Sequence, residues 1–339
     1  MPGIFLAAFS YVAALMGAGF ASGQETLTFF AVFSEYGIIG IAAASLIIGI
    51  FGGMVSEYAF AYGKDYNEIT GTLFSCRTGR VIDMLTFFFS ICTAAVMCAC
   101  FGELMNMLFG INKLLGAVLL AGVTTLVLFT GSEGTAAVNA AIGVIMFIAA
   151  ATVCLYLLGY REHQTFAPIG AAVSGINYAG YNLITSGTIL ASGRIFLKKR
   201  GDGFAAGAVS GIMIFILLTL MWGIIGIYYG KINLGELPMM TLALRESREL
   251  ALFYGLIIAA AVFTTAISNG LCALQYLEGY LQNKAGAIIV MLLSLILSCV
   301  GFSGLIDTVY RYCGAAGIIL AFAIIFRIKK CKKIDKQRF

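Results

Sequence analysis

The stretch GAGFASGQE, residues 17–25, places three glycines within seven residues and then a glutamine and a glutamate, all inside an apolar run. An unpaired backbone amide or carbonyl is costly in hydrocarbon, so irregular backbone is tolerated there only where it lines a cavity or binds a ligand. A helix broken at this stretch would offer carbonyls to a cation and amides to a carboxylate. The alternative is that the small residues pack one helix closely against another.

A second stretch, IGAAVSGINYAGYNLITSGTIL, also mixes small and amide residues in an apolar run, and it predicts an interruption over residues 177–182. Matching interruptions in the two halves of a chain are the best sequence indication of a transporter binding site. The pocket wall would then hold rings and an amide that suit a small zwitterion, from Phe20, Tyr178, Tyr181 and Asn182. The alternative for these residues is aromatic packing, with the asparagine bonded within its own helix.

Two other segments place polar groups within apolar runs. Glu57, in GGMVSEYAF, is a carboxylate deep in a spanning segment, where an ionisable group is a functional-site hypothesis by default. In AAAVFTTAISNG, Ala261, Thr264 and Thr265 share one helical face and could offer neutral oxygens to a cation. The alternative is that both threonine hydroxyls bond back to their own helix.

The elements that must position these groups are membrane helices. Of the 339 residues 61% are hydrophobic and only 11% are charged, too few charges to cover the surface of a soluble domain. Apolar runs long enough to cross a bilayer of roughly 30 Å recur along the chain. They predict ten spans, at about 4–33, 37–63, 80–108, 113–130, 134–159, 169–197, 203–229, 249–281, 285–303 and 307–328.

The basic residues predict which way the spans face. With both termini inside, 15 of the 21 Lys and Arg residues lie on the cytoplasmic side, seven of them in the tail RIKKCKKIDKQRF. This tail accounts for much of the net charge of +5, which therefore does not point to nucleic acid. The cysteines show no paired spacing with histidine, so neither a metal site nor a cofactor is expected. The expected location is the inner (plasma) membrane, with multiple passes.

The motifs GAGFASGQE and GGMVSEYAFAYGK resemble those of the YkvI-type membrane proteins over essentially the whole chain. These are permeases of the amino acid–polyamine–organocation superfamily, with the LeuT-type fold. The resemblance implies an all-α fold of ten helices in a 5+5 inverted repeat, with helices 1 and 6 discontinuous. The repeats would be residues 1–160 and 161–333, followed by the basic cytoplasmic tail end 334–339, in a single transport domain.

The resemblance also implies roles for individual residues. The carbonyls of Gly17 and Phe20 would bind a sodium ion that is completed from Ala261, Thr264 and Thr265. The substrate site would be formed by Gly19, Phe20, Ser22, Gly23, Thr93, Tyr178, Tyr181 and Asn182, with the amides of Ser22 and Gly23 meeting a substrate carboxylate. Glu57 would accept the free amides of the broken sixth helix.

Gln24 and Glu25, just beyond the first break, are interpreted as gating residues. Glu25 and Arg311 could form an ion pair that closes the outer side, or Arg311 could pair with Asp307 four residues earlier on its own helix. A further possibility is that Glu25 carries a coupling proton.

The function expected from these observations is secondary active transport of a small amino acid-like solute, coupled to Na⁺. A proton-coupled permease of the same fold and a ligand-sensing membrane receptor are the alternatives. Sparse charges within the spans argue against a channel, and the absence of a nucleophile–base set or nucleotide-binding loop argues against an enzyme. Neither the substrate nor the oligomeric state follows from the sequence.

Overall fold

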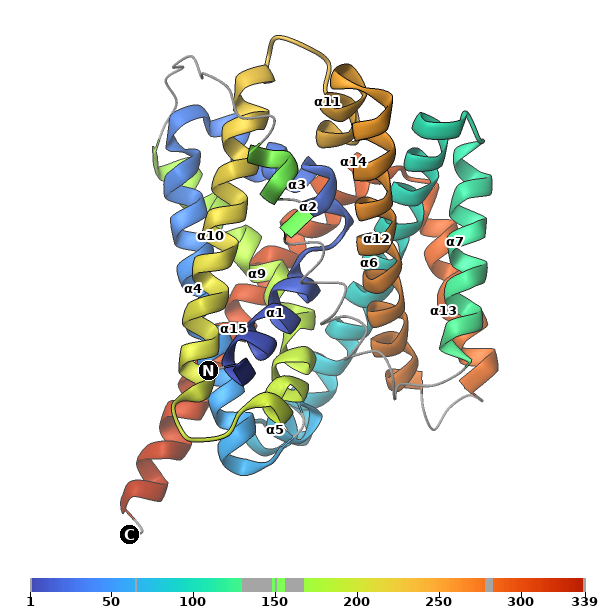
Figure 1. Ribbon diagram of the computed structural model, residues 1–339. Helices are drawn as coiled ribbons and strands as arrows, with labels where there is room; N and C mark the ends of the chain where they lie inside the picture. Colours follow the sequence, from blue (N-terminus) through green and yellow to red (C-terminus); the bar gives the residue numbers. More distant parts are fainter. Residues whose placement is uncertain are drawn as a thin grey trace.

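The structure is a computed structural model that describes residues 2–64, 66–129, 148–149, 151–155, 168–277 and 283–337 (Figure 1). Every regular element in these residues is helical. The longer elements are α1 (Pro2–Leu15), α4 (Gly37–Tyr62), α6 (Cys76–Phe109), α7 (Lys113–Leu128), α9 (Pro168–Ser192), α10 (Asp202–Tyr228), α12 (Arg248–Leu277), α13 (Asn283–Ser298) and α15 (Arg311–Gln337). The shorter ones are α2 (Ala18–Ser22), α3 (Gln24–Phe29), η1 (Ala31–Tyr36), α5 (Tyr66–Leu73), η2 (Gly193–Phe196), α11 (Pro238–Glu246), α14 (Phe302–Leu305) and the π-helical turn η3 (Ile306–Tyr310).

Five helical stretches in the described residues are long and apolar enough to cross a membrane, at Ala31–Tyr62, Arg77–Phe109, Asp202–Tyr228, Arg248–Leu274 and Phe302–Lys330. Three shorter apolar helices accompany them: α1, α7 and most of α13. The chain is therefore a membrane protein. Most of the expected span 134–159 lies outside the described residues.

The ends of these helices follow local capping rules. The hydroxyl of Ser75 accepts a hydrogen bond from the Thr78 amide at the start of α6, and the Asn112 side chain accepts one from the Leu114 amide at the start of α7. Left-handed glycines end α4 and α6, at Gly63 and Gly110.

The helices pack in two groups, with α1, α2 and α3 running alongside the first group and toward the second (Figure 1). In one group α4 packs against α9 and α10, and α15 packs against α9. In the other group α6 packs against α7, α12 and α13.

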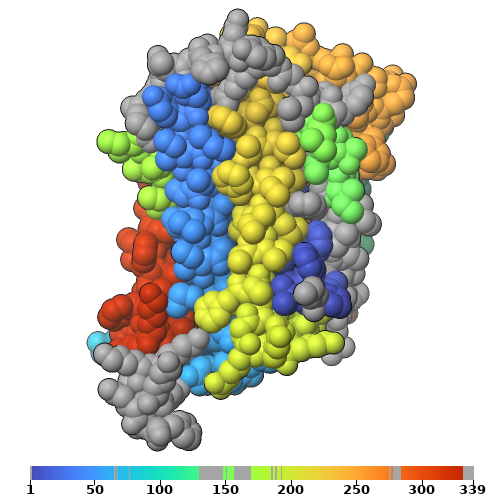
Figure 2. All heavy atoms as spheres, turned by 60° about the vertical axis from the view of Figure 1, so that its left-hand side comes forward, coloured from blue at the N-terminus to red at the C-terminus, as the bar shows by residue number. Residues whose placement is uncertain are grey.

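The two long helices α4 and α10 lie side by side on one face of the molecule (Figure 2). Their contact is made by glycines, and a Cβ at Gly207 would lie 2.5 Å from the Cα of Gly53. Small residues allow helices to approach this closely in a membrane. Outward-facing side chains such as Leu46 (64% exposed) and Ile212 (61% exposed) are apolar, as contact with lipid requires.

The predicted interruption of the sixth segment is wrong. Helix α9 runs without a break from Pro168 to Ser192, through residues 177–182. The amide of Asn182 donates to the Tyr178 carbonyl one turn earlier, and a Cβ at Gly180 would collide with the Gly314 carbonyl of α15. The small and amide residues therefore serve helix packing and bonding within the helix, which was the alternative interpretation of this stretch.

Candidate functional site

The first helix is broken where the glycine-rich stretch predicts. Helix α1 ends at Leu15, residues 16 and 17 are not helical, and α2 covers only five residues. Gly23 then adopts a left-handed conformation, with φ of 83°, and starts α3. The backbone changes direction twice within the buried part of this segment.

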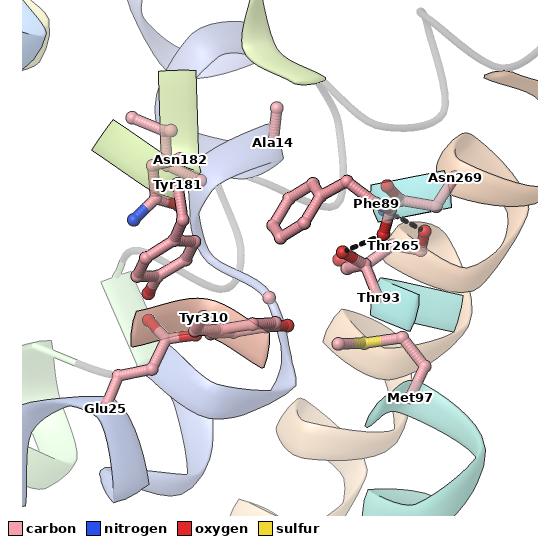
Figure 3. Close-up of a pocket in the computed structure, with 12 residues that line it drawn as sticks. Ala14, Glu25, Phe89, Thr93, Met97, Tyr181, Asn182, Thr265, Asn269 and Tyr310 are labelled. Carbon is pink, nitrogen blue, oxygen red and sulfur yellow. Dashed lines mark hydrogen bonds between the residues drawn. The ribbon is translucent and has the colours of Figure 1, made fainter. Parts of the chain in front are cut away.

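A small cavity of about 30 Å³ lies beside this break, with room for about one or two water molecules. Its lining comes from α1 and the break, α3, α6, α9, α12 and η3 (Figure 3). The lining residues are Ala14, Leu15, Gly17, Glu25, Phe89, Thr93, Met97, Tyr181, Asn182, Thr265, Asn269 and Tyr310.

Glu25 is the one carboxylate among these lining residues, and it is only 3% exposed. Its Oε2 atom has no hydrogen-bond partner, and the hydroxyl groups of Tyr178 and Tyr181 near it also form no well-aligned bond. In Figure 3 the carboxylate lies beside Tyr310 and points toward the hydroxyl of Tyr181. We call Glu25, Tyr178, Tyr181 and Tyr310 the Glu25 cluster.

The residues expected to bind sodium are only partly brought together. Gly17 and Thr265 both line the cavity, and a Cβ at Gly17 would lie 3.7 Å from the Thr265 hydroxyl oxygen. The Thr264 hydroxyl instead donates to the carbonyls of Ala260 and Ala261 on its own helix. Phe20 and Ala261 are fully buried and do not line the cavity.

The groups of α2 and Gly23 that were expected to contact a substrate are not free in the structure. The Gly23 amide donates to the Phe20 carbonyl, and the Ser22 hydroxyl donates to the Gly19 carbonyl, so these groups are occupied within the short helix. The Gly17 carbonyl likewise accepts from the Ala21 amide. The resemblance implies that the Gly23 amide and the Gly17 carbonyl are free to bind ligands, but in this conformation both already form backbone hydrogen bonds.

Three other expected substrate residues do reach the cavity: Thr93, Tyr181 and Asn182 line it. The Thr93 hydroxyl donates to the Phe89 carbonyl on α6. Tyr178 is fully buried just behind the lining, where its ring packs edge-on against Tyr181 with centroids 5.4 Å apart.

Glu57 accepts free backbone amides, but not at a break in the sixth segment. Its carboxylate oxygens accept from the Gly201 amide at 2.9 and 3.0 Å, and Oε2 also accepts from the Gly203 amide at 3.2 Å. These amides begin α10, whose first turn has no partners within the helix. Glu57 therefore caps α10, and the expected role at the sixth helix is corrected.

Neither of the two ion pairs considered for Arg311 forms. Arg311 is exposed on α15 and pairs with neither Glu25 nor Asp307. The neighbouring residue Tyr310 is the one that faces inward. Gln24, also expected to gate the site, is buried, and its side-chain oxygen has no hydrogen-bond partner.

Sequence reasoning missed six residues that line the cavity: Ala14, Leu15, Phe89, Met97, Asn269 and Tyr310. Asn269 lies one turn beyond Thr265, and its side-chain amide donates to the Thr265 carbonyl. Its place on the same helical face could have been read from that spacing. Tyr310 carried no such signal, because the π-helical turn η3 decides which residues of this segment face inward.

The described residues contain no group of three or more His, Cys, Asp or Glu side chains that could hold a metal ion. What the site offers is a broken helix, one buried carboxylate, tyrosine rings and neutral oxygens around a small cavity. This arrangement suits reversible binding of a cation or a small polar solute.

Comparisons with known proteins agree with this geometry. No model of a protein family matches the chain. It is 25% identical to the uncharacterized membrane protein YkvI of Bacillus subtilis, over 98% of this chain and 96% of that protein. The chain is thus a homologue of YkvI. The resemblance of its motifs to those of YkvI-type proteins is confirmed.

Solved transporters share the fold of this YkvI homologue. Mhp1, a nucleobase-cation-symport-1 family transporter in a closed conformation, superposes with a TM-score of 0.68 at 17% identity, covering 95% of this chain and 77% of Mhp1. A Na⁺-coupled sialic acid symporter superposes with a TM-score of 0.64 at 13% identity, covering 96% of this chain and 78% of that one. The fold is therefore that of the LeuT-type secondary transporters.

Proposed function

We propose that this protein is a secondary active transporter that moves a small solute across the membrane by alternating access. The observation that carries the proposal is the break at residues 16–23, which opens onto a buried polar cavity within a fold shared with secondary transporters. Irregular backbone at this depth is costly unless it serves binding. Transport of this kind requires no reaction chemistry, so the proposal assigns no enzymatic activity to the site.

We propose sodium as the coupling ion. Gly17 at the break and Thr265 on α12 lie close together and both line a cavity large enough for a bare ion. Phe20 and Ala261 lie about one helical turn from these residues, and their carbonyls would add oxygens if α2 and α12 adjust when the ion binds. The Thr264 hydroxyl stays bonded to its own helix. The sialic acid symporter, which has a similar fold, is itself Na⁺-coupled.

The packing supports the proposed 5+5 inverted repeat. The distribution of Lys and Arg residues supports placing both termini in the cytoplasm. The repeat pairs α1–α3 with α9, α4 with α10, α6 with α12 and α7 with α13. Accordingly, α4 packs on α9 as α10 packs on α1, and α6 packs on α13 as α12 packs on α7. The repeats would cover residues 1–160 and 161–333, and the membrane would be the plasma membrane.

In the proposed cycle the binding of sodium and solute favours closure, because both ligands contact the broken helix. The segments α1–α4, α9 and α10 would then move as one bundle against the remaining helices and open the site inward. Their close packing through glycines supports movement as a unit.

A proton-coupled permease is the second candidate, favoured by the buried carboxylate of Glu25. It would bind a proton where the first candidate uses a sodium ion. The two differ in whether a sodium gradient drives uptake.

The test is uptake of radiolabelled amino acids and amines into proteoliposomes that contain the purified protein. Accumulation driven by an inward Na⁺ gradient, and absent with K⁺ at the same ionic strength, is the expected result. Accumulation driven only by an inward proton gradient would select the second candidate. Binding without accumulation under either gradient would contradict transport and favour a receptor.

A further inference from the structure

We propose that the Glu25 cluster recognises a positive charge on the transported solute, so that the cargo carries an ammonium or other organic cationic group. This inference deepens the proposed transport function and rests on it. It replaces the gating role of Glu25 with direct contact to the solute.

The first observation is that Glu25 lacks an internal counter-ion. Burying an ionised carboxylate is costly unless a cation or several hydrogen bonds compensate for the lost water. Glu25 is 3% exposed and its Oε2 atom has no hydrogen-bond partner. No Lys or Arg side chain whose burial is described is buried, so the described part of the chain offers no cation for this carboxylate.

The second observation is the set of rings around the carboxylate. Tyr181 and Tyr310 stack with centroids 4.4 Å apart, and Tyr178 meets Tyr181 edge-on. Phe29 and Phe89 extend the cluster, since the rings of both pack near Tyr181. Aromatic faces attract cations, and an aromatic site with a carboxylate suits an ammonium group.

The third observation is that the cluster has unused hydrogen-bonding capacity. The hydroxyl oxygens of Tyr178 and Tyr181 are buried near the Glu25 carboxylate and form no well-aligned hydrogen bond. Buried polar groups in folded proteins are nearly always paired, so several unpaired ones around one cavity indicate a ligand. An ammonium group supplies donors only, which is what a carboxylate and hydroxyl oxygens can accept.

The cluster is also placed so that cargo binding and helix movement are linked. Glu25 lies on α3, Tyr181 on α9 and Tyr310 on η3, three segments far apart in sequence. The π-helical turn brings Tyr310 into the cavity (Figure 3). The present cavity has room for only about one or two water molecules. An organic cation must therefore push the rings apart when it binds, and this moves the three segments that carry them.

The test compares charged solutes with uncharged or anionic analogues of similar shape. The pairs are choline with 3,3-dimethylbutan-1-ol, isopentylamine with isopentyl alcohol, and leucine with 4-methylpentanoic acid. Thermal unfolding of the purified protein is followed at rising solute concentration, in Na⁺ and in K⁺ buffers. Wild type, Glu25→Gln and the control Glu103→Gln are measured in parallel, since Glu103 is half-buried on α6 and pairs with Lys113.

We expect at least one charged member to stabilise the wild type at about tenfold lower concentration than its partner, and Glu103→Gln to keep that preference. Glu25→Gln is expected to lose it. Absence of any charge preference in the wild type, or an undiminished preference in Glu25→Gln, would overturn the inference.

Two tyrosine variants keep the test decisive if Glu25→Gln does not fold. Tyr310→Phe retains the ring and should retain the charge preference, whereas Tyr310→Leu should lose it. Equal behaviour of these two variants would contradict recognition by ring faces.

Uptake assays separate this inference from the proposed function. Charge-selective binding through Glu25 without uptake would leave the inference intact and refute transport. Uptake of a positively charged solute by Glu25→Gln at the wild-type rate would refute the inference and leave transport intact.

Discussion

The side chain of Glu25 occupies the space that a side chain at Gly19 would need: a Cβ atom on Gly19 would lie 2.6 Å from the Cγ atom of Glu25. The bare face of α2 is therefore the surface against which the buried glutamate side chain packs. The break in the first helix and the carboxylate of the cavity are one structural unit, in which Gly19 and Glu25 lie six positions apart in sequence.

Substituting Gly19 by alanine tests this unit. The added methyl group should displace the Glu25 side chain and weaken binding of the transported solute at least tenfold, about 1.4 kcal/mol. Isothermal titration of the purified protein measures the effect. The control is Gly122→Ala on α7, where a Cβ meets no atom within 4 Å. Unchanged affinity in Gly19→Ala would contradict the packing argument.

The two neighbouring threonines of α12 should differ in their effect on sodium. Thr265→Val removes a hydroxyl that faces the cavity and should raise the half-saturating Na⁺ concentration about tenfold or more, about 1.4 kcal/mol. Thr264→Val removes a hydroxyl bonded to its own helix and should change it little. Uptake at varied Na⁺ concentration is the measurement, and equal effects of the two variants would count against the proposed ion site.

Glu57→Gln should lower stability without altering selectivity. The substitution removes the negative charge that accepts the Gly201 and Gly203 amides, and hydrogen bonds to charged groups contribute about 1.5–3 kcal/mol. Thermal unfolding in detergent should show the loss, while solute preference of the folded fraction stays as in the wild type.

The control for Glu57 is Glu246→Gln, an exposed glutamate at the end of α11. If both variants unfold at the wild-type temperature, the capping role of Glu57 is wrong.

Gly23→Ala should destabilise the protein by about 1–2 kcal/mol, the cost of a left-handed backbone for a residue with a side chain. Position 23 has φ of 83°, and a Cβ there would also lie 2.8 Å from side-chain atoms of Ile225 and Met239. Denaturant unfolding measures the loss. Gly223→Ala on α10, which has open space at its Cβ, serves as the comparison, and equal stability of the two variants would argue against strain at Gly23.

Local sequence was enough to predict the break in the first helix. Three glycines in seven residues, followed by Gln24 and Glu25, disfavour a continuous apolar helix. The structure accordingly shows the helix interrupted at residues 16–23. The same reasoning failed for α9, because glycine can either break a helix or let it pack closely. Only the neighbour decides, and here Gly180 meets Gly314 of α15.

The groups that contact the two buried carboxylates, Glu57 and Glu25, likewise could not be predicted from the sequence. Glu57 was identified as a capping residue for free amides, but the amides belong to the start of α10, 144 and 146 residues away. An ion pair between Glu25 and Arg311 was one of two alternatives for Arg311, yet the π-helical turn η3 orients the start of α15 so that Tyr310 faces the cavity.

The sequence alone determined that this is a membrane protein, that its first helix is interrupted and that a carboxylate follows the interruption. The thickness of the hydrocarbon layer sets the length of each apolar run, and the cost of unpaired backbone groups limits where a helix can be interrupted. Both constraints act within one segment, so they can be read from the sequence of that segment. Tertiary structure decided that α9 stays whole, which amides Glu57 accepts and which rings surround Glu25. Those outcomes depend on helices far apart in the chain coming into contact, and no local pattern encodes which ones meet.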